Sequence, residues 1–134
     1  MTMTMATAYW CVLVAALLPY VWVGVAKSAS KGYDNRDPRG SVGRQTNPRV
    51  HRAVAAQLNG FEAFPAFIAG VVLAQLAGVD AARIATLSIA FVVFRIAHGA
   101  FYLADRALLR SLAWAGGIAC AFGLIALAAL RVDA

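Results

Sequence analysis

The chain has 134 residues, of which 62% are apolar and only 13% carry a charge. Soluble globular domains are less apolar and more highly charged, so the composition excludes an ordinary soluble domain. One helical crossing of a hydrocarbon core needs about 20 apolar residues. The sequence therefore predicts an all-α integral membrane four-helix bundle, with a single domain over residues 1–134. The formal net charge of +6 is concentrated in one connection between apolar runs, so we expect membrane lipid, and no nucleic acid, as a partner.

The first half of the chain contains one apolar run, a polar connection and the start of a second run. The run at 6–26 has no preceding Lys or Arg and is longer than the core of an ordinary signal peptide, so we expect a retained helix. The connection at 27–49 is rich in Gly, Ser, Asn and Asp, and its pattern predicts a solvated loop. Asn47 and Pro48 suit the N-cap and first turn of a second helix, which we expect over 48–77.

Two further helices are expected over 81–104 and 111–130, with a turn at 105–110 between them. The last helix carries small residues at four-residue spacing, a pattern that lets another helix approach closely. These residues are Ala113, Gly117 and Ala121. We expect this face to serve helix packing, including packing between subunits.

The distribution of Lys and Arg predicts the orientation in the membrane. Residues 27–52 hold seven basic residues, and Arg106 and Arg110 follow the third helix on the same side. The opposite side holds only Arg83 and Arg131. Connections rich in Lys and Arg stay in the cytoplasm. We therefore expect both termini on the non-cytoplasmic side of a membrane, with a bacterial inner membrane as the expected location.

The two middle helices each carry a narrow polar stripe. The stripes consist of Arg52, Asn59 and Glu62 in the helix at 48–77, and of Arg95, His98 and Tyr102 in the helix at 81–104. An unpaired charge in the middle of a bilayer costs at least ~2.5 to 3.5 kcal/mol, so the stripes should face each other. One antiparallel register would pair Glu62 with Arg95 and place Asn59 level with His98.

Three interpretations of the stripes stay open. In the first, an internal ion pair only fixes the register of the two helices. In the second, the excess of Arg over Glu62 at the basic side binds an anionic ligand, and the apolar bundle wall admits a lipophilic substrate from the bilayer. An ion channel ranks below both, because the other halves of these helices hold few polar residues.

Three short motifs resemble a known family of membrane proteins. The segment Asn-Gly-Phe-Glu at 59–62, with Pro65 shortly after, is similar to an Asn-x-x-Glu motif. Arg-Ile-Ala-His at 95–98, followed by Tyr102, is similar to Arg-x-x-His-x-x-x-Tyr, and an Arg-Ser pair stands at 110–111. In this order they resemble the MAPEG family, the membrane-associated proteins in eicosanoid and glutathione metabolism, over the last three expected helices.

The resemblance implies a homotrimer that binds glutathione as a co-substrate between subunits on the cytoplasmic side. It also implies that the thiolate of glutathione attacks a lipophilic electrophile or peroxide, as in microsomal glutathione transferases. The residues implied as glutathione ligands are Arg52, Asn59, Glu62, Arg95, His98 and Tyr102. Arg110 and Ser111 would be the catalytic residues nearest the sulfur, and no metal site is expected.

One departure from the family keeps an alternative function open. Members that use glutathione usually carry extra basic residues just before the Asn, where this chain has Ala55, Ala56, Gln57 and Leu58. In the alternative, the protein is a non-catalytic membrane protein that binds lipid or small molecules, and the polar stripe serves helix assembly.

Overall fold

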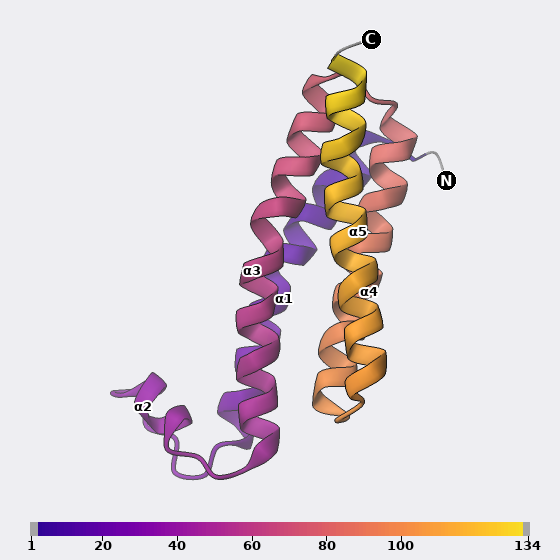
Figure 1. Cartoon of the computed structure of the whole chain (residues 1–134). Coiled ribbons are helices and arrows are strands. Elements are labelled where there is room, and N and C mark those ends of the chain that lie inside the picture. The colour runs from indigo at the N-terminus through magenta and orange to yellow at the C-terminus, as the bar shows by residue number, and fades with distance from the viewer. Residues whose placement is uncertain (1–2, 133–134) are drawn as a thin grey trace.

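The computed structural model of the chain describes residues 3–132 and consists of helices joined by short connections (Figure 1). The helices are α1 (Met5–Ala29), α2 (Pro38–Gly43), α3 (Pro48–Leu76), α4 (Ala81–Leu103) and α5 (Ala107–Val132). The four long helices are each long and apolar enough to cross a membrane. The start of α1 and the end of α5 lie at the same end of the bundle, as an even number of crossings requires (Figure 1). The expected all-α membrane bundle is confirmed.

The sequence signals at the helix ends are visible in the structure. The side chain of Asn47 accepts a hydrogen bond from the backbone N–H of Arg49, and Pro48 is the first residue of α3. At the far end of α3, Gly78 has a φ of 75°, and the chain turns at once into α4. Asp80 caps α4 by accepting a hydrogen bond from the N–H of Arg83. These short connections make α3, α4 and α5 close antiparallel neighbours.

The start of α5 differs from the expected position. We expected a turn up to residue 110, but α5 begins at Ala107. The reason is that Asp105 adopts a left-handed φ of 59° and the N–H of Arg106 bonds to the carbonyl of Phe101 at 2.9 Å, so α4 closes within two residues. Arg110 and Ser111 therefore lie in the first turns of α5, on a rigid element.

The connection between α1 and α3 is more ordered than the sequence predicts. It contains α2, whose first turn is capped by Asp37 through the N–H of Gly40. Val42 of α2 is buried in a small cluster with Val50 and Ala53 of α3. This cluster attaches the polar connection to the end of the bundle.

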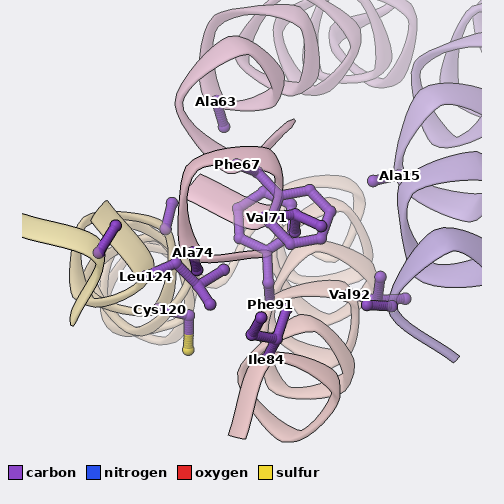
Figure 2. Close-up of a cluster of buried hydrophobic side chains, with 13 residues drawn as sticks. Ala15, Ala63, Phe67, Val71, Ala74, Ile84, Phe91, Val92, Cys120 and Leu124 are labelled. Carbon is purple, nitrogen blue, oxygen red and sulfur yellow. The ribbon is translucent and has the colours of Figure 1, made fainter. Parts of the chain in front are cut away.

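The apolar core lies between the helices in the half of the bundle that contains the chain ends (Figures 1 and 2). Its centre is a stacked pair of rings, Phe67 of α3 and Phe91 of α4, with centroids 3.9 Å apart. Leu124 of α5 packs beside them, and branched aliphatic residues and alanines complete the cluster (Figure 2). In lipid, such close packing stabilises a bundle through van der Waals contact, because lipid tails are as apolar as the side chains.

The small-residue face of α5 packs inside the chain. Ala113 and Ala121 are buried, and a Cβ added at Gly117 would touch Phe94 and Arg95 of α4. This face thus packs against α3 and α4 within one chain. Because these residues are covered in the single chain, they are not free for the packing between subunits that the sequence also allowed.

Candidate functional site

The two polar stripes face each other as expected, but with different partners. Arg95 and His98 of α4 are almost fully buried, with exposed fractions of 4% and 2%. The Nη2 of Arg95 donates a hydrogen bond to Oδ1 of Asn59 at 2.8 Å. A guanidinium in the middle of the bundle is therefore bonded to a neutral amide, and its charge stays uncompensated by that contact.

The expected ion pair between Glu62 and Arg95 is not formed within residues 3–132. Glu62 is exposed on the surface of the chain, and the ion pairs of this part of the chain involve other residues. The reason is angular: three residues separate Asn59 from Glu62, which turns the side chain about 60° around α3. Arg95 therefore bonds to the amide, while Glu62 stays exposed and forms no ion pair with Arg95.

The stripe of α4 continues to α5 through contacts among three side chains. The rings of His98 and Tyr102 meet edge to face with centroids 5.5 Å apart. The guanidinium carbon of Arg110 lies 4.6 Å from the centroid of the Tyr102 ring, a cation–π arrangement. Arg110 is thus brought to the stripe. Ser111, in contrast, is not brought to the stripe. It is exposed and makes no side-chain hydrogen bond to any residue from 3 to 132.

Arg52 lies at the outer end of the stripe, near the start of α3. Its Nη1 is 3.5 Å from Oδ2 of Asp105, which stands in the turn between α4 and α5. We did not predict this contact. A signal for it was present, because the register that would level Asn59 with His98 also levels Arg52 with Asp105.

Three buried nitrogen atoms of the stripe have no hydrogen-bond partner among the described residues. They are Nε of Arg52, Nη1 of Arg95 and Nδ1 of His98. The two Arg atoms are obligatory donors, and leaving a buried donor unsatisfied costs about 1–3 kcal/mol. The stripe therefore presents unused donors and positive charge, which suits an anionic ligand.

The interior of the single chain offers little room beside these donors. A cavity of about 10 Å³ lies between α1, α3 and α4, with Trp22, Gly60 and Arg95 in its wall. That volume holds about one water molecule. A larger groove, of about 680 Å³, lies at the opposite end of the bundle beside Asp80 and Arg131. The cavity beside Arg95 is therefore too small for a ligand larger than water in the single chain.

A comparison with known proteins identifies the family. The family model described as the MAPEG family matches residues 7–130, which is nearly the whole chain. No curated protein matches the sequence. The match includes both polar stripes and all four long helices. The chain therefore belongs to the MAPEG family and is an integral membrane protein of the family of glutathione and eicosanoid metabolism.

Proposed function

We propose that this protein is a membrane-bound glutathione transferase or peroxidase. In this proposal glutathione binds at the cytoplasmic side, between the subunits of a homotrimer, and its thiolate attacks lipophilic electrophiles or peroxides. The observation that carries the proposal is the buried guanidinium of Arg95, which has a neutral partner in Asn59 and an unused donor at Nη1. Membership of the MAPEG family supports glutathione as the anion.

The charges of the site match those of the ligand. Glutathione carries two carboxylates and one ammonium group, and Arg binds carboxylates in a directed, bidentate manner. Arg52 and Arg95 each have a buried donor available for a carboxylate. The exposed carboxylate of Glu62 is an acceptor for the ammonium group.

A site between subunits accounts for two features of the single chain. The cavity beside Arg95 has room for about one water molecule, and Glu62 is exposed on the surface of the single chain. A second copy of the chain packed against α3 would enclose the donors of the stripe and Glu62 between the two copies. Glutathione would then lie between two copies, in contact with Asn59, His98 and Tyr102 of one.

The catalytic roles fall to Arg110 and Ser111 at the start of α5. Arg110 is held against the ring of Tyr102, and the N-terminal end of a helix also stabilises negative charge. A free thiol has a pKa of about 8.5, and a neighbouring cation lowers the pKa and favours the thiolate. The hydroxyl of Ser111, the next residue, would donate to the same sulfur.

The proposal includes the orientation of the bundle in the membrane. The basic connection between α1 and α3 and the α4–α5 turn share one side of the bundle, and this side also holds the outer end of the stripe (Figure 1). The distribution of Lys and Arg supports a cytoplasmic location for this side. Cytoplasmic glutathione would therefore reach the site directly, in a bacterial inner membrane with both termini on the other side.

The proposal is tested by thermal unfolding of the detergent-purified protein with and without millimolar glutathione. A ligand that binds only the native state raises Tm in a saturable way. We expect such a rise for the wild type and for Arg131→Ala, which changes an Arg at the opposite end. We expect none for Arg95→Ala, whose folding is checked by its oligomeric state and helical content. Conjugation of a model electrophile and reduction of an organic peroxide then test the chemistry.

One observation favours the alternative function. The residues that precede Asn59 on α3 are Ala55, Ala56, Gln57 and Leu58, so the stripe has no basic side chain between Asn59 and Arg52. In a non-catalytic protein the contact of Arg95 with Asn59 would serve helix assembly alone. In that case glutathione leaves Tm unchanged, while Arg95→Ala still lowers it.

A further inference from the structure

The contact between Arg52 and Asp105 stands apart from the motifs of the site. Arg52 precedes Asn59 by seven residues, about two helical turns, so both lie on one face of α3 about 10.5 Å apart along its axis. Arg52 therefore marks the outer end of the stripe, and the contact of Asn59 with Arg95 marks its inner part. Between these two points α3 contributes no other positive charge.

Asp105 engages only part of the Arg52 guanidinium. The single contact is between Nη1 and Oδ2 at 3.5 Å, while Nε is buried and has no partner among residues 3–132. A bidentate carboxylate takes Nε and one terminal nitrogen together. The Nε edge of Arg52 thus lacks an acceptor within residues 3–132, while Asp105 restrains the side chain through Nη1.

The backbone of Asp105 does not require a carboxylate. Its φ of 59° lies in the left-handed region, which Gly adopts without strain and which Asn and Asp tolerate. Gly or Asn would serve the turn at least as well as Asp. The feature that Asp alone adds at this position is the negative charge facing Arg52.

We propose that Asp105 is a positioning residue that holds Arg52 as a second anion-binding point of the site, and that the site selects ligands with two carboxylates about 10 Å apart. This inference rests on the proposed function. Arg95, with Asn59, binds one carboxylate of glutathione, and Arg52 binds the other. Arg52 thereby replaces the basic residues that are absent from positions 55–58.

The test compares glutathione with two analogues that each lack one carboxylate. One is the glycine amide of glutathione, and the other has 4-aminobutyrate in place of the γ-glutamyl residue. Equilibrium affinities are measured for the wild type, Asp105→Asn, Asp105→Gly and Arg52→Gln. Asp80→Asn is the matched control, because it makes the same change at the other connection and Asn can still cap α4.

We expect one analogue to bind the wild type and Asp80→Asn about three- to tenfold more weakly than glutathione does. In the Asp105 and Arg52 variants the affinity for glutathione should fall by a similar factor. The difference in affinity between glutathione and that analogue should then disappear. In turnover the Asp105 variants should raise KM and leave kcat unchanged, because the contact is equal in the ground and transition states. A merely structural role would not remove the discrimination between ligands.

The outcomes separate this inference from the proposed function. If the wild type does not bind glutathione, both are wrong. A different result would be that the wild type binds glutathione, while Asp105→Asn and Asp105→Gly bind it equally well and bind the analogues as weakly as the wild type does. In that case only the role proposed for Asp105 is wrong. Unfolding of Asp105→Gly is measured alongside, and its Tm should be no lower than that of the wild type.

Discussion

Arg95 donates a hydrogen bond to Asn59 at 2.8 Å across the interface of α3 and α4. The donor is buried and charged, whereas the acceptor is half-buried and neutral. Two helices are therefore joined by a contact that leaves a positive charge available inside the bundle. The functional proposal depends on that positive charge of Arg95. Substitutions of Asn59 separate the contribution of the Arg95–Asn59 hydrogen bond to the stability of the bundle from the contribution of the Arg95 charge to ligand binding.

Asn59→Asp should retain the bond to Arg95 and abolish glutathione binding. The new carboxylate satisfies Arg95 and neutralises the charge that would attract the ligand. Asn59→Ala should instead lower the free energy of unfolding by about 1–2 kcal/mol, because it removes an interhelical hydrogen bond and leaves Arg95 with fewer partners. Thermal unfolding and glutathione titration of both variants test this. A tightly binding Asn59→Asp variant would contradict the role given to the charge.

Gly99→Ala should destabilise the bundle through a steric clash. A Cβ at this position would collide with the ring of Trp22, so α1 could not keep its place against α4. We expect a loss of about 1–3 kcal/mol, typical of overpacking. Gly123→Ala is the control, because a Cβ there meets nothing within 4 Å. Equal melting temperatures of the two variants would show that α1 does not approach Gly99 as described.

Glu62→Gln should change ligand binding and assembly more than the fold of one chain. Glu62 is exposed and forms no ion pair within residues 3–132, so its removal costs the isolated bundle little. We expect glutathione to bind at least about fivefold more weakly, because the ammonium group loses its acceptor. Titration and mass determination in detergent test this. Unchanged affinity and unchanged oligomeric state would exclude Glu62 from the site.

Arg44→Gln should raise the pKa of Asp37 in the connection between α1 and α3. The side-chain hydrogen bond from Arg44, with a backbone hydrogen bond from Gly40, holds the pKa of Asp37 below its usual range. A lowered pKa means that the charged carboxylate stabilises this connection at neutral pH and that the effect is lost as the pH falls through the folded-state pKa. Carboxyl NMR titration measures the shift, with Arg36→Gln as a control that should leave it unchanged.

The sequence predicts the helices well because their signals are local. The length of each apolar run indicates a crossing, and Asn47, Pro48 and Gly78 mark helix ends through their own backbone preferences. The family was predictable for a related reason. Its motifs occupy two successive helices, and the match over residues 7–130 confirms the membership.

The sequence predicts the partners within the site less well, because they depend on angles and side-chain reach. Helical periodicity places Glu62 and Asn59 in one stripe, but a turn of about 60° decides which of them meets Arg95. The early start of α5 was not predicted for another reason. The left-handed backbone conformation of Asp105 both ends α4 and starts α5 early, and an Asp in a polar turn gives no local signal of that conformation.

The central claim is that the charge of Arg95, which its neutral partner Asn59 does not neutralise, binds glutathione. The most direct measurement is calorimetric titration of glutathione into the protein in lipid nanodiscs, for the wild type, Arg95→Gln and Arg131→Gln. Gln at position 95 can still donate a hydrogen bond to an amide oxygen but carries no charge. We predict saturable binding to the wild type and Arg131→Gln and at least about tenfold weaker binding to Arg95→Gln. Absence of binding to the wild type, or equal binding to all three, would contradict the account.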